Sequence, residues 1–386
     1  MEGIYLDYNS TTPTAPEVAL AMAPFFTDNF ANPFNLHRFG QRARGPVNEA
    51  RESVAALLGA ASPDEIIFTG GGSESDNLAV KGVAAASVSR GRHVITSAIE
   101  HPAVLLACEW LADMGWDVTF LPPDDEGIVN ADALAAAIRP DTVLVSIMHA
   151  NNEVGTVEPV AELAAVARER GVLFHTDAVQ TAGKLPVNVN DLGVDLLSIS
   201  AHKFYGPKGV GALYVRNGVE LVPLIHGGHQ EEGRRAGTHN TPGIIGLARA
   251  LELATADREE EGKRLGRLRD RLKDGILAMP GKVVVMTPAG KAMPNTLNVC
   301  FPGIEGEAIM LALDMEGISA ATGSACASGS SEPSHVHAAM GCPPEVARGS
   351  IRFSLGKYTT EEDIGRVLKV LPPVVERLRA VSPTNE

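Results

Sequence analysis

The chain has 386 residues, with 33 lysines and arginines against 47 aspartates and glutamates, so its formal net charge is −14. Hydrophobic residues make up 45% and charged residues 21%, a globular composition that excludes disorder along the whole chain. The acidic balance, with no basic stripe, argues against a nucleic-acid or membrane-surface binder and favours a small substrate. The length predicts about two domains.

The first residues, MEGIYLDYNSTTP, contain neither a basic stretch nor an apolar run, and no segment reaches the roughly 18 apolar residues that span a bilayer. We therefore expect an unprocessed cytoplasmic protein. The four cysteines, Cys108, Cys300, Cys326 and Cys342, are scattered and form no C-x-x-C pair. Neither a disulfide framework nor a zinc knuckle is predicted.

Between residues 65 and 215, short apolar segments alternate with turns and alanine-rich segments of helical type. This alternation is typical of a mostly parallel sheet whose strands are covered by helices on both faces. The expected strands are EIIFT (65–69), HVITS (93–97), DVTFL (117–121), TVLVSIM (142–148), VLFHT (172–176), DLLSIS (195–200) and GALYV (211–215).

After residue 244 a long charged segment of helical period leads to the short apolar runs VVVM, NTLNVCF and SIRFSL and to a final helix. This texture predicts a smaller α+β domain. We expect an α/β fold with a seven-stranded, mostly parallel sheet in a large domain, residues 14–257. Residues 1–13 and 258–386 are expected to form the small domain.

Three features of the large domain carry chemistry. Gly70–Gly72 and Ser73 join a strand to a helix, which fits either a phosphate site or a tight turn with an N-cap serine. Asp177 and Lys203 follow two other strands, where a helix cap and a solvated lysine are the ordinary explanations. Because ligands bind at the carboxyl ends of strands in open α/β sheets, the three features together favour pyridoxal phosphate (PLP).

At these residues the chain shows a family resemblance. SISAHKFYGPKGVGALYVR resembles the lysine signature of class V, fold-type I PLP enzymes, and further motifs resemble the cysteine desulfurase family. The resemblance runs from Leu6 to the last helix. The other motifs are LDYNSTTP, NPFNLHRFG, TGGGSESDNLAVKG, EHPAV, HANNEVGTVEP, HTDAVQTAGK and GSACASGSSEPSHV.

The resemblance implies a role for each cofactor residue. Lys203 would form the Schiff base with PLP, and Asp177 would pair with the pyridinium nitrogen. Gln180 would bond the ring oxygen, while His101 would stack on the ring and take part in proton transfer. The expected phosphate ligands are Gly72, Ser73, Ser200 and His202.

The resemblance also places the substrate and a second subunit. Asn152, beside the cofactor, and Arg352 would hold the carboxylate of L-cysteine, a task suited to a planar, permanently charged guanidinium. Thr238 would reach the phosphate of the neighbouring subunit, which implies a homodimer with shared active sites.

The surroundings of Cys326 distinguish it from the other cysteines. Cys300 and Cys108 lie in apolar segments and read as inert core residues, whereas Cys326 lies among small residues, where a thiol can be exposed and reactive. By resemblance it would take sulfur from L-cysteine as a persulfide and leave alanine. The long glycine- and serine-rich segment resembles the group that supplies iron–sulfur assembly proteins or other sulfur acceptors.

Some residues depart from the family pattern, in which Arg, Ser and an apolar residue are usual where this chain has Glu232, Ala236 and His337. The sequence ends soon after the last expected helix, without the longer extension that some relatives use to dock to a scaffold protein, so the resemblance does not predict such docking. No metal is expected, because the histidines at 226, 229, 335 and 337 have no completing carboxylate or cysteine ligand.

Two other functions remain alternatives to a desulfurase. One is another class V enzyme, either an aminotransferase, which needs no thiol such as Cys326, or a selenocysteine lyase, which is harder to exclude. The other is a non-catalytic sulfur-relay subunit. The presence of every expected catalytic residue argues against that subunit and favours the desulfurase.

Overall fold

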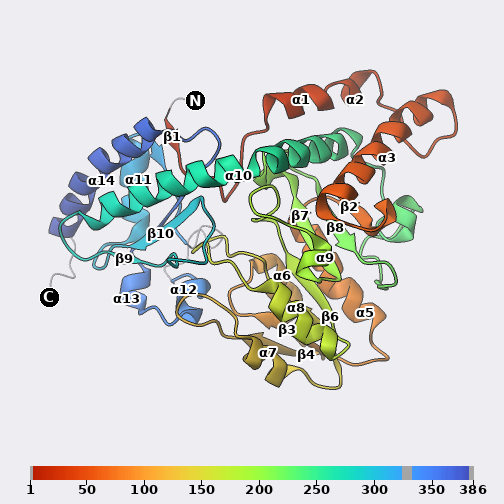
Figure 1. Ribbon diagram of the computed structural model, residues 1–386, viewed down its shortest axis with the longest axis horizontal. Coiled ribbons are helices and arrows are strands. Elements are labelled where there is room, and N and C mark those ends of the chain that lie inside the picture. Colours follow the sequence, from red (N-terminus) through yellow and green to blue (C-terminus); the bar gives the residue numbers. More distant parts are fainter. Residues whose placement is uncertain (1–2, 324–332, 382–386) are drawn as a thin grey trace.

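The structure, a computed structural model, describes residues 3–323 and 333–381. A large part built on one seven-stranded sheet and a smaller part with two short sheets are joined by the long helix α10 (Thr241–Leu277). Figure 1 shows α10 running from one part into the other. The predicted α/β fold with a seven-stranded, mostly parallel sheet is confirmed.

The large sheet has the strand order β2-β8-β7-β6-β5-β3-β4. Neighbours from β7 to β4 are parallel, whereas β8 is antiparallel to β7 and to β2, so β2 and β7 run in the same direction. The strands are β2 (Ile66–Thr69), β3 (His93–Ser97), β4 (Asp117–Leu121), β5 (Thr142–Ser146), β6 (Leu173–Asp177), β7 (Leu196–Ser200) and β8 (Gly211–Val215).

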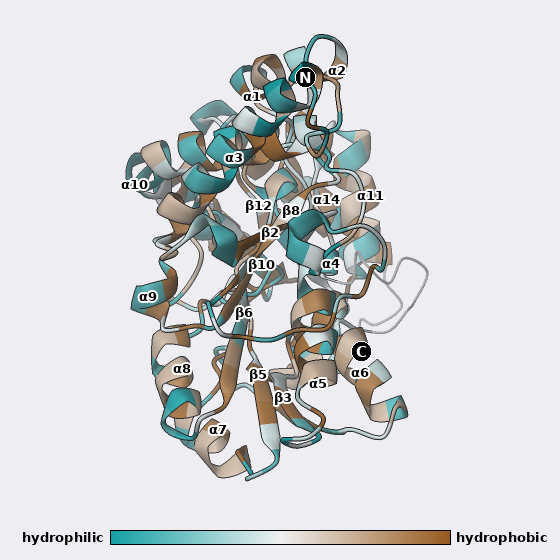
Figure 2. Cartoon of the chain, turned by 90° about the vertical axis from the view of Figure 1, so that its right-hand side faces the viewer, coloured by the Kyte–Doolittle hydropathy of each residue, from teal (hydrophilic) through white to brown (hydrophobic). Residues whose placement is uncertain are grey.

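Alternate strand residues enter two different hydrophobic cores, as the pleat requires. Ile66 and Phe68 of β2 belong to the core that also contains residues of α3, α8 and α10, while Ile67 belongs to the core with residues of α5 and α6. In Figure 2 the inner strands β5 and β6 are brown, which marks hydrophobic residues. The helices and turns are α1 (Pro16–Met22), α2 (Pro24–Thr27), α3 (Arg38–Leu58), η1 (Pro63–Glu65), α4 (Gly72–Asn77), η2 (Leu78–Gly82), α5 (Val83–Ala86), α6 (Pro102–Asp113), α7 (Ala131–Ala137), α8 (Val160–Glu169), α9 (Val189–Leu192), η3 (Ala201–Lys203) and η4 (Gln230–Gly233).

Strand β4 differs from the prediction that all seven strands are covered on both faces. It lies at the edge of the sheet, and its residues Asp117 and Phe120 are exposed. The expectation is wrong for this strand because helices cover it incompletely, whereas β2, at the other edge of the sheet, is fully buried.

The small part combines the chain's beginning with its C-terminal third. Strand β1 (Ile4–Tyr5) pairs in parallel with β11, and β12, β10 and β9 form an antiparallel sheet. The first half of α10 packs in a core of the large part and the second half in the core of the small part, so the predicted domain boundary at residue 257 falls within one helix. The remaining elements are β9 (Val284–Val285), β10 (Thr296–Cys300), α11 (Gly306–Met315), β11 (Ile318–Ser319), α12 (His335–Ala339), α13 (Pro344–Ala347), β12 (Ser350–Ser354) and α14 (Glu361–Val381).

The directions of the strands bring several carboxyl ends together at one end of the sheet. Strands β2, β6 and β7 run in the same direction, so their last residues, Thr69, Asp177 and Ser200, lie at the same end of the sheet, the end that faces the small part. Within the described ranges, the search for a helix long and apolar enough to cross a membrane found none.

Candidate active site

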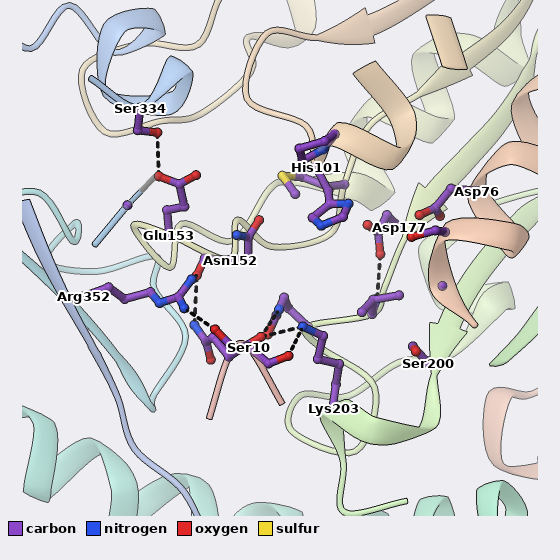
Figure 3. Close-up of a pocket in the computed structure, with 18 of the residues that line it drawn as sticks. Ser10, Asp76, His101, Asn152, Glu153, Asp177, Ser200, Lys203, Ser334 and Arg352 are labelled. Carbon is purple, nitrogen blue, oxygen red and sulfur yellow. Dashed lines mark hydrogen bonds between the residues drawn. The ribbon is translucent and has the colours of Figure 1, made fainter. Parts of the chain in front are cut away.

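A cavity of about 690 Å³ lies where the strand ends of the large part meet the small part. Figure 3 shows its side chains converging from both sides. The structure brings together here most of the residues predicted from the sequence. They are Gly72, Ser73, His101, Asn152, Asp177, Gln180, Ser200, His202, Lys203 and Arg352.

The glycine turn forms one wall of the cavity. A Cβ atom on Gly72 would lie 2.8 Å from Val179 Cγ2 and 3.3 Å from Ser200 Cβ, so only glycine fits between the turn and the ends of β6 and β7. Ser73 does not cap the helix as one reading predicted, because α4 already begins at Gly72 and Gly71, with φ of 152°, is its N-cap. The tight turn leads into an adjoining cup of about 480 Å³.

Lys203 lies at the centre of the cavity because the η3 turn directly follows β7. Its Nζ donates hydrogen bonds to the carbonyl oxygens of Asn9 at 2.6 Å and Ser10 at 2.8 Å. The residue is half-buried, so it is no solvated loop lysine. The N-terminal segment therefore places the amine toward the ends of β6 and β7.

Asp177 ends β6 with its carboxylate in the cavity. Its Oδ1 accepts a hydrogen bond from the Val179 N–H at 2.8 Å. Burial raises the pKa of Asp177 to about 6, although that hydrogen bond and the Lys203 charge act in the opposite direction. Behind it, burial and the Asp177 charge raise the pKa of Asp76 well above its usual range. These shifts favour the protonated form of Asp76, whereas Asp177, with a pKa of about 6, is mostly ionised at pH 7.

His101 covers the cavity from the N-terminus of α6. Its Nδ1 accepts a hydrogen bond from the Ala103 N–H at 3.1 Å. Burial, with the charges of Lys203 and His335, lowers the pKa of His101 to about 4. The ring is therefore neutral at pH 7, and because Nδ1 accepts, its proton is on Nε2.

Arg352 enters the cavity from the small part, on β12. Its Nη1 donates to the Asn152 carbonyl oxygen at 3.0 Å, and its Nη2 donates to Asp7 Oδ1 at 2.6 Å and to Ser10 Oγ at 2.8 Å. The side chain is 4% exposed. A buried, fixed guanidinium at the edge of a cavity is suited to a carboxylate ligand.

Glu153 lies beside Arg352 and contacts residues that flank the stretch 324–332. Its Oε2 accepts a hydrogen bond from Ser334 Oγ at 2.6 Å, and a Cβ atom on Gly323 would lie 2.8 Å from the same oxygen. Burial raises the pKa of Glu153 to about 7, against the opposing effects of Ser334 and Arg352. This carboxyl therefore changes charge near neutral pH.

Cys326 lies outside the described residues. Among the cysteines that the structure does describe, Cys108 and Cys300 are buried, as predicted. Burial raises the pKa of each thiol to about 12, which disfavours the thiolate that a nucleophile needs. Neither is suited to attack a substrate.

Three other residues singled out in the sequence, Thr238, Glu232 and His337, do not line the cavity. Thr238 is exposed. Glu232 pairs with Arg234 at 3.5 Å, and His337 is buried with Nε2 3.1 Å from Asn298 Oδ1. In the described ranges, no three histidine, cysteine or acidic side chains cluster as metal ligands would.

Asn9, Ser10, Asp76 and Glu153 also line the cavity, although none of them was expected there from the sequence. Each belongs to a motif quoted for the family resemblance. Apart from membership of these motifs, a position immediately beside a predicted site residue is a signal for one of the four. That residue is Glu153, which follows Asn152.

Comparisons with known proteins agree with this geometry. The family model described as aminotransferase class-V matches residues 4–367. The chain is 54% identical over 383 residues to the cysteine desulfurase IscS of Dictyoglomus turgidum, covering 99% of this chain and 97% of that protein. It is 51% identical to the cysteine desulfurase IscS of Methanosarcina thermophila, covering 99% and 94%.

Solved structures show the same likeness. A NifS-like protein superposes with a TM-score of 0.92 at 41% identity, covering 97% of this chain and 100% of that chain. The structure titled SspA in complex with cysteine has a TM-score of 0.82 at 41% identity, covering 92% and 100%.

Proposed function

The chain belongs to the cysteine desulfurases of the aminotransferase class-V family, and from this premise we propose that its cavity binds PLP and L-cysteine, with Lys203 and Cys326 as the reactive side chains. The protein is thus an enzyme that removes sulfur from cysteine. The observation that carries the residue assignment is the meeting of Lys203, Asp177 and Arg352 in one cavity.

The residues present fit PLP. The cradle at Gly72 and the hydroxyl of Ser200 suit a phosphate, together with Ser73 and His202. The anionic Asp177 suits a pyridinium nitrogen, and Gln180, the ring oxygen. When bound, PLP supplies an electron sink for negative charge that develops at the substrate's Cα.

The side chains of this chain then divide the work. Arg352 and Asn152 hold the substrate carboxylate and so orient Cα toward Lys203. The Lys203 amine binds the cofactor and moves the proton at Cα. His101 covers the ring and presents Nε2–H to the substrate, and the neutral imidazole can exchange that proton at pH 7.

The transfer of sulfur from L-cysteine to Cys326 requires no added oxidant. The substrate's Cβ–S bond breaks, an S–S bond forms on Cys326, and Cβ gains a proton, so cysteine and a thiol give alanine and a persulfide. The persulfide sulfur then passes to an acceptor protein, in the manner of the long-loop desulfurases that supply iron–sulfur assembly.

A homodimer is part of the same proposal. The stretch from Leu20 to Phe39 exposes large apolar side chains, Leu20 at 73% and Leu36 at 85% among them. Phe34 lies 5.3 Å from the His239 ring, which joins this stretch to the loop of Thr238. An apolar surface next to Thr238 supports an interface at which that residue reaches the partner's cofactor. Sedimentation of the holoenzyme tests this, because a monomer at micromolar concentration would contradict it.

The function is tested by measuring sulfide and alanine released from L-cysteine in the presence of a reductant. The wild type and a Cys342→Ala control should release equal amounts of both products, and Cys326→Ala should release neither. Normal turnover by Cys326→Ala would overturn the role of that thiol. A PLP-loaded wild type inactive on L-cysteine would redirect the test to selenocysteine and transamination.

A further inference from the structure

The guanidinium of Arg352 is already engaged by the protein at the position where a ligand would bind. Three of its five N–H groups donate hydrogen bonds, and both hydrogens of Nη2 are used, by Asp7 Oδ1 and Ser10 Oγ. Nε is buried and has no hydrogen-bond partner within the described part of the chain.

This arrangement limits how a carboxylate can bind. A carboxylate meets an arginine through two parallel N–H groups, either Nε with Nη2 or Nη1 with Nη2. Both arrangements include Nη2. A substrate carboxylate that binds in this way must therefore replace one of the two partners of Nη2.

The two partners differ in how readily they can leave. Ser10 is neutral and lines the cavity, whereas Asp7 lies outside the cavity lining and is the counter-ion of a guanidinium that is 4% exposed. A substrate carboxylate that replaced Asp7 would only exchange one anion for another beside the guanidinium, whereas one that replaces the neutral Ser10 hydroxyl adds a charge-assisted hydrogen bond. The Ser10 hydroxyl also donates to Asp7 Oδ1 at 2.8 Å and keeps that bond when it leaves Arg352.

We propose that Asp7 is the positioning residue that holds Arg352 for the substrate carboxylate, and that the Ser10 hydroxyl is the exchangeable partner that the carboxylate replaces. This rests on the proposed role of Arg352 in substrate binding. Asp7 thus sets the preference of the enzyme for amino acids over simple amines, without touching the reacting atoms.

The experiment compares two ligands of the PLP-loaded enzyme by titrating its visible absorbance. L-Alanine carries the carboxylate, and ethylamine is the same molecule without it. Asp7→Ala should weaken L-alanine binding roughly tenfold to a hundredfold, the effect of losing a charged hydrogen bond, and leave ethylamine binding unchanged. Asp7→Asn keeps an acceptor oxygen and should restore part of the loss, to roughly threefold.

The other variants separate this inference from the role of Arg352. Ser10→Ala should bind L-alanine at least as tightly as the wild type, and Glu17→Ala, at an exposed acid on α1, should match the wild type. With L-cysteine, Asp7→Ala should raise KM and leave kcat nearly unchanged, because the lost interaction holds substrate and transition state alike.

Several results would overturn the inference. Equal weakening of both ligands by Asp7→Ala would show a merely structural residue, and no weakening would show that Asp7 does not position Arg352. Weaker L-alanine binding by Ser10→Ala would make Ser10 a ligand instead of an exchangeable partner. If Asp7→Ala does not fold, the test rests on Asp7→Asn alone, which should bind L-alanine roughly threefold more weakly than the wild type does. Unchanged L-alanine binding by Asp7→Asn would then overturn the inference. Arg352→Gln tests the proposed function separately, since unchanged L-alanine binding there would remove Arg352 from the site.

Discussion

The two halves of the cavity are built in different ways. On the side of the large part, the expected cofactor residues directly follow strand ends, and buried hydrogen-bonded strands fix their positions. On the side of the small part, Arg352 is held by residues 7, 10 and 152, which lie far from it in the sequence. Cofactor chemistry in this protein therefore depends on the fixed ends of the strands, while substrate selection depends on contacts between segments that are distant in the sequence.

Removal of the central lysine breaks the cofactor half most completely. Lys203→Ala should lower turnover by about a thousandfold or more, because Lys203 is the only lysine among the described residues that line the cavity. Absorbance spectra should show loss of the visible band while circular dichroism stays that of a folded protein. Lys263→Ala, on the exposed surface of α10, is the control and should behave as wild type. Turnover within tenfold of wild type in Lys203→Ala would contradict the assignment.

On the same side of the cavity, removal of the charge of Asp177 tests the different roles of Asp177 and Asp76. Asp177→Asn should lower kcat roughly a hundredfold, because the ring nitrogen loses its anionic partner. Asp76→Asn should cost only a few-fold, since burial already favours the neutral form of Asp76 by raising its pKa. Asp195→Asn, at a half-buried carboxyl just before β7, serves as the control. Steady-state kinetics with L-cysteine decide, and equal losses at Asp76 and Asp177 would refute the division of roles.

A single methyl group should loosen the phosphate cradle. Gly72→Ala places Cβ 2.8 Å from Val179, so the turn must move, and we expect roughly tenfold weaker PLP binding and a loss of about 1–3 kcal/mol in stability. Gly45→Ala, in the middle of α3 with open space around it, is the matched control and should be neutral or slightly stabilising. PLP equilibrium binding and urea unfolding measure both effects. Unchanged PLP affinity in Gly72→Ala would place the phosphate elsewhere.

The same contrast explains what the sequence could predict. Lys203, Asp177 and the glycine turn were identified because each adjoins an apolar strand, and parallel strands bring their ends together. The edge position of β4 was missed because an apolar run does not show which strand lacks a neighbour. Asp7, Ser10 and Glu153 had no such signal, since their roles arise from contacts across hundreds of residues, as between Asp7 and Arg352.

The Ser73 cap shows a different limit. A serine after three glycines fits an N-cap, but the N-cap is Gly71, two residues earlier, where the backbone adopts a conformation that other residues rarely reach. Local patterns predicted the existence of the turn, while its register depended on how tightly Gly72 packs against Val179 and Ser200.

The smallest predicted effect concerns the pH response of the substrate half. The folded protein raises the pKa of Glu153 from 4.5 to about 7, so between these values the folded state keeps a proton that the unfolded chain releases. The contribution of Glu153 to stability therefore falls as pH rises through this window, by at most about 1.4 kcal/mol per pH unit, and levels off above pH 7. Glu153→Gln cannot ionise at this position. The free energy of unfolding of the variant minus that of the wild type should therefore increase from pH 5 to pH 7.

Urea unfolding of the two proteins at several pH values measures this increase. Because both contain the same other buried carboxyls, the contributions of Asp177 and Glu158 cancel in the difference. Glu109→Gln, at an exposed position of α6, should show a constant difference from the wild type. A constant difference for Glu153→Gln as well would mean that Glu153 is ionised throughout. The charge beside Arg352 would then be fixed, and the substrate half would be as insensitive to neutral pH as the neutral His101 of the cofactor half.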